Sequence, residues 1–453
     1  MPEIRTRRRA LIGLAALAAL AAAAPAQAAD DVIVAGQRLH VVRDPFLAPA
    51  PAAERTAPAP HLVAPAAGAA GGVVATVDAA LRRHAITAAE HERYLRIYRN
   101  SLRIRASLSG RCRTQLANVM IALSKLATAG KLSASRMPVL FRQLSRNAEF
   151  WQRRPRISAG QRVTFPGELV LWQHFAGQGI QFHPLANWGR AAAVAEYCRK
   201  LGSKCVATQN SLRLRLDRLL SLASQRSGFT TWEYFFWFEG GRPPWTSGMS
   251  QGTAIQALAV GARVLKAPSI SGPATGQYPS GGVAPPVRPP EAPRRRYLRV
   301  AADALGAFER RAPAGVRVPA DGGDHYLLYS FAPRNRVLNG FLQSLIGLYD
   351  FARLTGNRTA RHLFRLGNRA ATREAPRYDT GKWSKYNNLG EVSSGSYHAL
   401  VTEFLIRLCQ RTHSKVYCRL AARFARYMGG VPSQNGGGGG GGGGTSGPVC
   451  GQV

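Results

Sequence analysis

Two tyrosines stand in a glycine- and serine-rich segment near the C-terminal end of the chain, RYDTGKWSKYNNLGEVSSGSYH. Tyr386 comes shortly after the turn sequence Tyr378-Asp379-Thr380-Gly381, and Tyr397 precedes His398 at the predicted start of a helix. A tyrosine hydroxyl can transfer protons when an adjacent arginine lowers its pKa from about 10 toward neutrality. The pattern therefore indicates acid–base chemistry, and the alternative is two rings that pack at a helix entrance and bond the backbone.

Two further blocks have the same character as this one. They are FWFEGGRPPWTSGMSQGTA (236–254) and YSFAPRNRVLNGFLQSLIGLYDF (329–351). In each block, polar, aromatic and glycine residues form a predicted loop beside an apolar helical run. An upstream stretch, FPGELVLWQHFAGQGIQFHPLANWGRA (165–191), interrupts its periodicity at Gly177 and Gly179 and also gathers polar side chains.

The order of these blocks and their amino-acid sequences resemble the C-terminal domain of the D-glucuronyl C5-epimerase family. The resemblance spans about residues 165–428 and is strongest over 236–398. That family inverts C5 of uronic acid units, which requires removal of a proton next to a carboxylate and its return on the other face. Such chemistry needs donors that stabilise the developing enediolate and two acid–base groups, one on each face of the ring.

The family assigns these roles to a glutamate and two tyrosines, and the resemblance carries the tyrosine roles to Tyr386 and Tyr397. The glutamate position, counted back from the sequence Val337-Leu338-Asn339-Gly340-Phe341, is occupied by Leu328, which is followed by Tyr329. An arginine that follows the first tyrosine in the animal enzymes is also replaced. Either the two tyrosines work as a pair, or Asp324 or Glu391 takes the place of the glutamate, or the activity differs. Asp324 has the alternative of a turn residue in its DGGD loop.

The remaining candidates are predicted to bind substrate. Aromatic rings can cover the apolar face of a sugar, although a tryptophan such as Trp245 can equally belong to the core. Asn339 lies on an apolar helix, where an inward amide needs partners, so a structural role is favoured for it. The predicted substrate-binding residues are Tyr329, Trp245, Glu239, Gln251, Asn339, Tyr378, His398, Gln178 and Gln181.

Helical periodicity dominates from Thr76 onward, and strand signals are almost lacking. In the C-terminal half the predicted helices come in pairs: 249–266 with 297–311, 336–354 with 360–371, and 398–411 with 416–428. Helical hairpins that cannot each bury their own face pack into a ring or a stack. The sequence therefore predicts an all-α chain, and the resemblance favours an α/α toroid, incomplete or closed, over residues 76–430.

The flanking segments predict export and little structure. A cleavable signal peptide is predicted over 1–28. It has a basic start at Arg5 and the arginine run 7–9, an apolar stretch over 10–24 and a small-x-small pattern at 26–28, and it includes a partial twin-arginine pattern. An Ala/Pro-rich linker is predicted over 29–75, a mobile Pro/Gly-rich insert over 267–296 and a disordered Gly-rich tail over 431–453. The expected location is therefore secreted or extracytoplasmic.

Six cysteines in an exported chain favour disulfides. Cys198 and Cys205 enclose a short polar segment, and Cys409 and Cys418 enclose another between two helical patterns, so each pair is predicted to be bonded or else to be separate buried thiols. No metal-ligand spacing of the CxxC kind occurs, and no cofactor is implied.

The formal net charge is +37, and such a field attracts polyanions unless the arginines merely cover solvated helix faces. Export argues against nucleic acid as the partner, and no later stretch predicts stable membrane insertion. The first functional hypothesis is an exported uronosyl C5-epimerase acting on an acidic polysaccharide such as heparosan or another uronan. The alternatives are a uronate lyase on the same fold and a non-catalytic polysaccharide-binding protein. The resemblance also suggests a homodimer.

Overall fold

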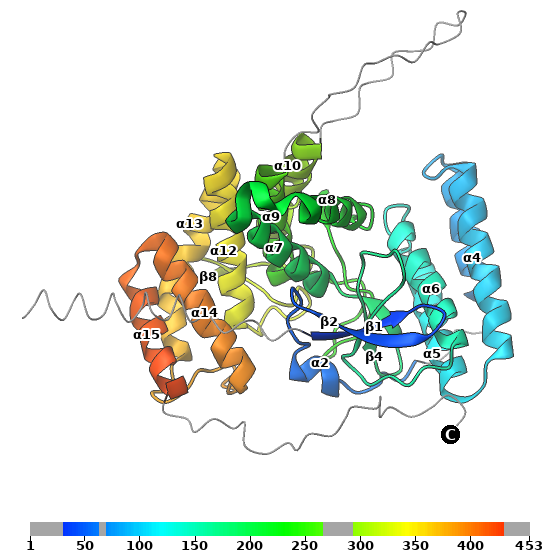
Figure 1. Cartoon of the computed structure of the whole chain (residues 1–453), viewed down its shortest axis with the longest axis horizontal. Coiled ribbons are helices and arrows are strands. Elements are labelled where there is room, and N and C mark those ends of the chain that lie inside the picture. The colour runs from blue at the N-terminus through cyan, green and yellow to red at the C-terminus, as the bar shows by residue number, and fades with distance from the viewer. Residues whose placement is uncertain (1–29, 63–68, 266–292, 430–453) are drawn as a thin grey trace, which may run out of the picture.

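A computed structural model describes residues 30–62, 69–265 and 293–429, which are mostly helical with three small sheets (Figure 1). The predicted signal peptide 1–28, the insert up to residue 292 and the tail 431–453 lie outside the described residues. Within the described residues, no helix is both long and apolar enough to span a bilayer.

Four pairs of sequential helices make up most of the C-terminal part of the molecule. The pairs are α7 (Pro184–Leu201) with α8 (Val206–Leu220), α9 (Gly248–Val264) with α10 (Pro293–Asp303), α12 (Leu338–Thr355) with α13 (Arg358–Glu374), and α14 (Gly395–Thr412) with α15 (Lys415–Gly429). The helices that periodicity predicts are present with nearly the predicted ends. The exception is the helix predicted over 297–311, which is divided into α10 and the short α11 (Gly306–Glu309).

One member of each pair contacts the next pair. Helix α7 packs on α9, α9 on α12, and α12 on α14, while α8, α10, α13 and α15 each lie against their own partner. The tightest of these contacts is between α9 and α12. A Cβ atom at Gly347 would lie 2.1 Å from the carbonyl oxygen of Gly252, so the two backbones meet with no room for a side chain.

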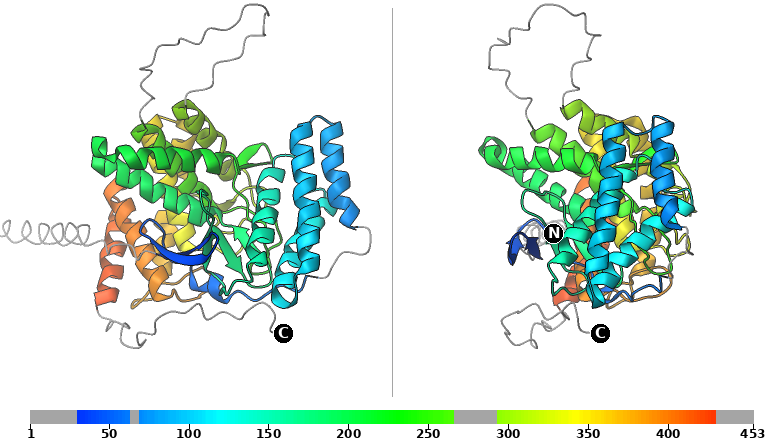
Figure 2. Two further views of the ribbon diagram at one scale, coloured as in Figure 1. Left: turned by 45° about the vertical axis from the view of Figure 1, so that its right-hand side comes forward. Right: turned by 90° about the vertical axis from the view of Figure 1, so that its right-hand side faces the viewer.

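The N-terminal part contains a second group of helices, α3 (Ala69–Arg82), α4 (Ala88–Ser107), α5 (Gly110–Thr128) and α6 (Met137–Gln152). They contact one another and lie at the far end of the molecule from α14 and α15 (Figure 2). Helix α4 begins with a capping box, in which Thr87 and Glu90 each bond the other's backbone N–H. This group flanks the largest sheet through α5 and α6.

The expectation of an all-α chain is correct for most of the described residues but misses three sheets. The largest has the order β2-β1-β3-β4-β5, with β1 parallel to β3 and the other pairs antiparallel. Two hairpins form the others. The strands are β1 (Asp30–Ala35), β2 (Leu39–Asp44), β3 (Arg162–Thr164), β4 (Trp172–Phe175), β5 (Gly179–Phe182), β6 (Ser224–Arg226), β7 (Phe229–Thr231), β8 (Arg317–Ala320) and β9 (Gly323–Tyr326). Most span only three or four residues, too few for an alternating pattern to stand out.

Side-chain amides from α5 and α6 cover the β5 edge of the sheet. Gln115 accepts the N–H of Gly179, Asn147 bonds both the N–H and the carbonyl of Ile180, and Gln143 accepts the N–H of Phe182. The edge strand is thereby satisfied without a further strand. The stretch around Gly177 and Gly179 is therefore part of a buried sheet.

The predicted linker over 29–75 is wrong for its described residues. Residues 30–62 form β1, β2 and the short helix α2 (Ala52–Thr56), and α3 already begins at Ala69. Arg162, which is 3% exposed, anchors the segment through an ion pair with Asp30 at 2.7 Å and a hydrogen bond to the carbonyl of Ala48. Long-range pairing of this kind leaves no trace in local composition, which is why an Ala/Pro-rich stretch resembles a linker.

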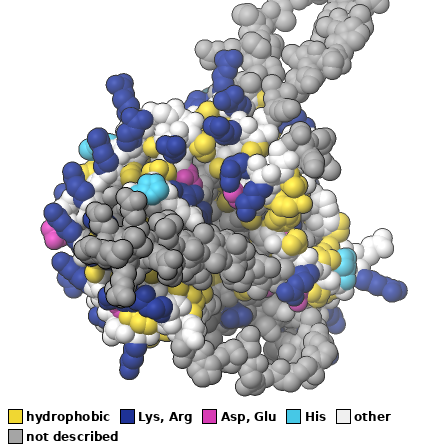
Figure 3. All heavy atoms as spheres, turned by 60° about the vertical axis from the view of Figure 1, so that its left-hand side comes forward, with side chains coloured by type: hydrophobic (Ala, Val, Ile, Leu, Met, Phe, Trp, Pro, Cys, Tyr) yellow, Lys and Arg dark blue, Asp and Glu magenta, His cyan; other side chains and the backbone are white. Residues whose placement is uncertain are grey.

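Basic side chains dominate the surface. Figure 3 shows lysine and arginine side chains scattered over the described part of one face, with few acidic side chains among them. Ion pairs with the 24 acidic residues can neutralise only a minority of the 61 basic ones. The excess positive charge is thus distributed over the described surface rather than confined to one element.

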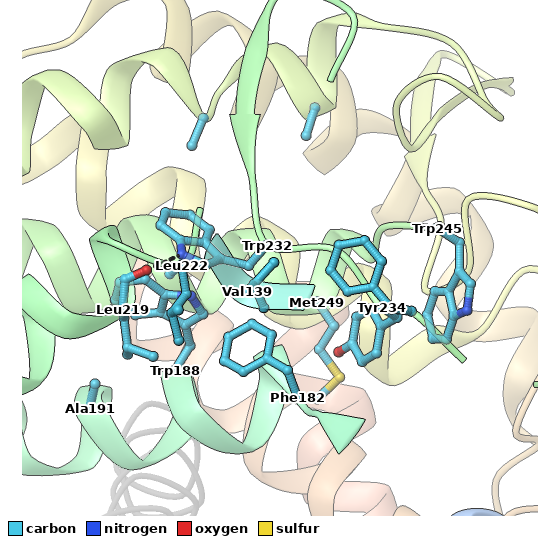
Figure 4. Packing of buried hydrophobic residues seen from close by; sticks show 14 of the residues in the cluster. Val139, Phe182, Trp188, Ala191, Leu219, Leu222, Trp232, Tyr234, Trp245 and Met249 are labelled. Carbon is cyan, nitrogen blue, oxygen red and sulfur yellow. Dashed lines mark hydrogen bonds between the residues drawn. The ribbon is translucent and has the colours of Figure 1, made fainter. Parts of the chain in front are cut away.

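The core is rich in aromatic side chains, and Figure 4 shows part of it. Trp188 of α7 meets Trp232 edge to face with ring centroids 4.5 Å apart, and the Trp232 indole N–H donates to the carbonyl of Leu219. Tyr234 and Trp245 lie parallel with centroids 4.0 Å apart. These contacts join α7 and α8 to the loop that precedes α9.

Both predicted disulfides are present, Cys198–Cys205 between α7 and α8 and Cys409–Cys418 between α14 and α15. Their Cα atoms are 5.2 and 4.9 Å apart, within the usual range for a disulfide. Cys112, which the sequence leaves without an evident partner, is disulfide-bonded as well.

We expect residues 30–62 to be required for stability. A chain that begins at residue 63 would leave Arg162 buried without Asp30, and losing one partner of a buried ion pair typically costs about 3–5 kcal/mol. Denaturant unfolding of this truncation should show at least that loss of free energy, whereas a chain that begins at Asp30 should keep its stability. Equal stability of the two chains would show that the segment does not pack as described.

Candidate functional site

Three loops converge at the N-terminal ends of α9, α12 and α14. The first is an irregular hairpin in which Tyr234 and Trp245 form an antiparallel bridge and residues 239 and 240 form the tip. The second runs from β9 to the start of α12 and is joined to the first by hydrogen bonds between Thr246 and Ser330 in both directions. The third precedes α14 and meets the second where the carbonyl of Tyr386 accepts the first N–H of α12.

A buried carboxylate fixes the base of the hairpin. Glu233, which is 1% exposed, accepts two hydrogen bonds from Arg136 at the start of α6 and one from Arg226. Arg226 also donates to the carbonyl of Pro244 on the returning arm. The first arm is thus tied to the start of α6 and both arms to Arg226 of β6, by charge-assisted hydrogen bonds, which are among the strongest in proteins.

The hairpin tip is held against the second loop by aromatic packing. Gly241 lies so close to the Phe331 ring that a Cβ atom would come within 2.4 Å of it. Tyr329 packs against Phe238 and Trp245, with ring centroids 5.7 and 5.9 Å apart. Glu239 at the tip has a φ of +45°, a strained conformation for a residue other than glycine. The charge of Glu239 at this tip reaches Tyr329 and raises the pKa of its hydroxyl, after burial and the neighbouring tyrosines.

Three tyrosine hydroxyls form a connected chain at this junction. The hydroxyls of Tyr329 and Tyr386 are 3.1 Å apart, and either can donate; the hydroxyl of Tyr397 also bonds that of Tyr386. Tyr329 and Tyr386 are buried and Tyr397 is partly exposed. Tyr386 is thus the central member of the chain, and both neighbouring hydroxyls can donate to a negative charge on its oxygen.

The pKa values of the three tyrosines are displaced upward, opposite to the shift that an adjacent arginine would cause. Burial raises the pKa of Tyr386 above its usual value, and Glu239 and Glu391 add to this, while the two hydroxyl donors oppose it. Burial also raises the pKa of Tyr329 and Tyr397, and nearby Tyr386 and Glu239 raise both further. All three are therefore protonated at neutral pH and act as hydrogen-bond donors or proton donors.

Tyr386 and Tyr397, the pair to which the resemblance carries the acid–base roles, lie side by side. Their ring centroids are 4.9 Å apart, and their hydroxyls are hydrogen-bonded to each other. In this arrangement both hydroxyls lie in one cluster, so a carboxylate near the cluster is a further candidate for the second acid–base group.

Carboxylates supply the other charged groups of the site. Glu239 is exposed at the hairpin tip, and its partial enclosure raises its pKa, with the charges of Glu391 and Glu54 adding to the effect. Glu391 lies in the third loop and accepts from the amide of Asn387 at 3.0 Å. Asp324 instead pairs with Arg317 at 3.8 Å on the β8–β9 hairpin, away from the tyrosine hydroxyls.

Glu54 is a member of this group that the sequence analysis missed. It lies on α2, within the predicted linker, and bonds His183 at 3.0 Å and Gln173 at 2.7 Å. Burial opposes its ionisation, but His183, Gln173 and Arg162 lower its pKa on balance, so it is ionised at neutral pH. Its charge reaches Tyr397 and Glu239. No local signal marks this glutamate, because its partners are more than one hundred residues away.

Several predicted substrate-binding side chains are instead buried and hydrogen-bonded within the protein. Trp245 is 3% exposed and donates to the carbonyl of Phe236, and Gln251 is fully buried among the backbone groups of residues 230–232. Such side chains cannot reach a sugar without unfolding their loop. These two residues position the hairpin and its junction with α9.

His398 and Tyr378 also have interior partners. One ring nitrogen of His398 accepts from the Ser384 hydroxyl at 2.7 Å, and the other donates to the carbonyl of Phe424 at 3.0 Å. The Tyr378 hydroxyl donates to the carbonyl of Arg336 at 2.9 Å. Both residues fix the third loop, and neither has a free polar atom for a ligand.

The remaining three amides are buried as well. Gln178 bonds both the N–H and the carbonyl of Trp237, and Gln181 accepts from Gln143 at 2.7 Å and donates to the carbonyl of Gln178. Asn339 is 1% exposed, with a side-chain oxygen that has no partner among the described residues. Of the nine predicted substrate-binding residues, the structure brings only Tyr329 and Glu239 to the tyrosine cluster.

Protonation of the three tyrosine hydroxyls can be tested by spectrophotometric titration. Between about pH 6 and about pH 10, the phenolate absorbance of the folded protein should be the same in the wild type and in Tyr386→Phe, since a raised pKa keeps that hydroxyl protonated there. A tyrosine that ionises near neutrality in the wild type and is lost in Tyr386→Phe would contradict this. The control is Tyr349→Phe, which removes a hydroxyl that donates to the carbonyl of Arg411 outside the cluster.

Comparison with known proteins gives a partial match in the region that carries the second and third loops. Residues 292–426 match the profile of the family described as D-glucuronyl C5-epimerase C-terminus. A D-glucuronyl C5-epimerase of Caenorhabditis elegans is 32% identical over 156 residues, which cover 30% of this chain and 25% of that protein. An uncharacterized protein of Methanocaldococcus jannaschii is 30% identical over 130 residues, which cover 27% of this chain and 42% of the relative.

The chain thus spans less than half the length of either of these curated relatives. Among solved structures, a family 105 glycoside hydrolase of C. acetobutylicum superposes with a TM-score of 0.31 and 12% identity, covering 79% of this chain and 92% of that one.

Proposed function

We propose that the protein is an exported uronosyl C5-epimerase that acts on an acidic polysaccharide, a proposal that the match of residues 292–426 to the D-glucuronyl C5-epimerase C-terminus supports. The observation that carries the proposal is the chain of three tyrosine hydroxyls, with the carboxylate of Glu239 near enough for its charge to raise the pKa of Tyr329. Its members come from different loops, so a purely local packing role explains the arrangement poorly. Two of the three, Tyr386 and Tyr397, are the tyrosines to which the family resemblance carries the acid–base roles.

The proposed fold is an incomplete α/α toroid. Helices α7, α9, α12 and α14 contact each other in sequence as an inner layer, and α8, α10, α13 and α15 are their outer partners. All three loops of the site precede an inner helix. The site therefore lies where the positive ends of several helix dipoles favour a bound carboxylate and the enediolate formed from it.

In the proposed reaction Glu239 is the base and the tyrosine cluster is the acid. Glu239 takes the proton from C5, and the electron pair moves into the adjacent carboxylate to give the enediolate. Tyr386 then delivers its hydroxyl proton to C5 from the opposite face, and hydrogen bonds from Tyr329 and Tyr397 stabilise the resulting phenolate. Proton exchange with solvent restores both groups. A carboxylate with a raised pKa suits this role, because a base works best when its pKa approaches the operating pH.

This assignment accounts for the loss of the family's glutamate at Leu328. The Leu328 side chain is 7% exposed and packs against the first turn of α12, at Gly340. Its position is thus filled by hydrocarbon, and Glu239 provides a carboxylate from the neighbouring hairpin instead. Glu391 is another carboxylate of the site, but one of its oxygens accepts a hydrogen bond from Asn387.

The proposed partner is a heparosan-like or other uronan chain. The net charge of +37 and the basic surface in Figure 3 support polyanion binding. Arg242, next to the hairpin tip, is exposed and makes no ion pair with a described residue, so it is available to a substrate carboxylate. Export is proposed from the first 28 residues, and a homodimer remains part of the proposal.

The deciding experiment is NMR of heparosan and related uronans incubated with the protein in D₂O. Deuterium at C5 without chain cleavage would support an epimerase. Absorbance from an unsaturated uronate would instead identify a lyase, and binding with neither outcome would identify a polysaccharide-binding protein. Either of the latter results would overturn the proposal.

We expect Tyr386→Phe to lower the rate of C5 deuterium exchange by about 10²–10⁴-fold, the usual contribution of a general acid or base. The ring and its packing remain, so polysaccharide affinity and thermal stability should be nearly unchanged. The Tyr349→Phe variant removes a hydroxyl on α12 far from the cluster and should keep full exchange. A Tyr386→Phe protein with the wild-type rate would refute the tyrosine assignment.

We expect Glu239→Gln to abolish most exchange, because an amide cannot accept the C5 proton. The matched variant Glu391→Gln should remain active and shift the acid limb of the pH–rate profile to lower pH. The reason is that the charge of Glu391 helps to raise the pKa of Glu239, and the base must be ionised to act. Full exchange in Glu239→Gln, or an unmoved acid limb in Glu391→Gln, would exclude Glu239 as the base.

A further inference from the structure

A cavity of about 290 Å³ lies between the N-terminal strands and the first helical pair. Its lining comes from β2 and the residues after it, from α7 and from α8, and shares no residue with the tyrosine cluster. Val42, Pro45, Phe46 and Val194 form its apolar part, and the polar part comes from Arg43, Asp44, Arg190, Thr208, Ser211 and Arg215.

Two of the lining arginines are enclosed with only one carboxylate between them. Arg190 pairs with Asp44 at 2.5 Å, and Asp44 is 6% exposed. Arg215 is also 6% exposed and has no carboxylate partner among the described residues, although it donates to the carbonyl of Leu169 at 3.2 Å. The site therefore holds one enclosed positive charge in excess.

The hydrogen-bonding capacity of these two groups is also incomplete. The Nε atoms of Arg190 and Arg215 are buried and have no acceptor within the described structure. Burial and the neighbouring charge of Arg190 lower the pKa of Arg215 to about 9, so both remain charged at neutral pH. An enclosed charge without a partner and unmet donors both cost free energy, and an anion bound between the two guanidiniums would offset both costs.

We propose that this cavity is a second carbohydrate site, which binds the carboxylate or sulfate ester of an acidic sugar unit between Arg190 and Arg215. A guanidinium matches the planar, two-oxygen geometry of either group. The Phe46 ring and the aliphatic side chains of Val42 and Val194 suit the apolar face of a pyranose, while the hydroxyls of Thr208 and Ser211 suit its polar groups. The anion preference follows from the cavity itself, and only the choice of a sugar rests on the proposed function.

The test measures binding of sodium glucuronate, sodium sulfate and uncharged glucose to the full chain by calorimetry at constant ionic strength. The wild type should bind one or both anions and not glucose. Arg215→Met keeps the length of the buried side chain but removes its charge, and should weaken anion binding by about 10- to 100-fold, as expected for loss of one charged hydrogen-bonding partner. The conservative variant Arg215→Lys should retain part of the affinity.

Arg218→Met is the matched control, because Arg218 lies on the same helix, α8, is exposed and does not line the cavity. It makes the same change in net charge and should leave anion binding as in the wild type. Equal losses in Arg215→Met and Arg218→Met would show only general electrostatic attraction and would overturn the proposal, as would glucose binding as tightly as glucuronate.

If neither anion binds to the wild type, the cavity proposal is overturned. The catalytic proposal, which rests on C5 exchange, would be unaffected by that result. Conversely, anion binding that depends on Arg215 in a protein without exchange activity would support the cavity and refute the catalytic proposal. Should Arg215→Met fail to fold, the wild-type comparison of glucuronate with glucose and the Arg215→Lys variant still decide the question.

Discussion

The close contact between α9 and α12 is the constraint on which the candidate site depends. Gly252 and Gly347 let the two backbones touch, and Gly248 at the start of α9 donates its N–H to the carbonyl of Leu327 at 2.9 Å. The loops that precede these helices are therefore brought side by side, which packs the hairpin that carries Glu239 against the loop that carries Tyr329. A side chain at Gly347 would separate the helices and with them the carboxylate and the hydroxyls, although neither group is near that glycine in sequence.

The electrostatics of the site follow from its position between loops rather than from an adjacent cation. Burial and nearby carboxylates keep the three tyrosines protonated, so the cluster is a source of protons and hydrogen bonds. Burial raises the pKa of Glu239, and the charges of Glu391 and Glu54 raise it further. The proposed acid and the proposed base thus differ in residue type and in environment, which is a common way for one site to hold both at neutral pH.

The sequence predicts the C-terminal helices and both described disulfide pairs, because each depends on signals within about twenty residues, and the family resemblance singles out all three clustered tyrosines. It fails where contacts are long-range. The strands are too short to show alternation, and Trp245 and Gln251 have the composition of cleft residues but fill the interior through partners that no local pattern reveals. Glu54 is the clearest case. Its role depends on hydrogen bonds to His183 and Gln173, which follow the helices α3–α6 in the chain.

The segment with the weakest sequence signal joins the two proposed sites. Residues 42–46 line the anion cavity, and Glu54, a few residues later, contributes its charge to the tyrosine cluster. Between them the carbonyl of Ala48 is bonded to the buried Arg162. A polysaccharide bound in the cavity would thus contact the same short segment that helps set the protonation of Glu239. Because the segment is anchored by a buried arginine and paired with the sheet, its place between the two proposed sites is fixed by contacts with the rest of the fold.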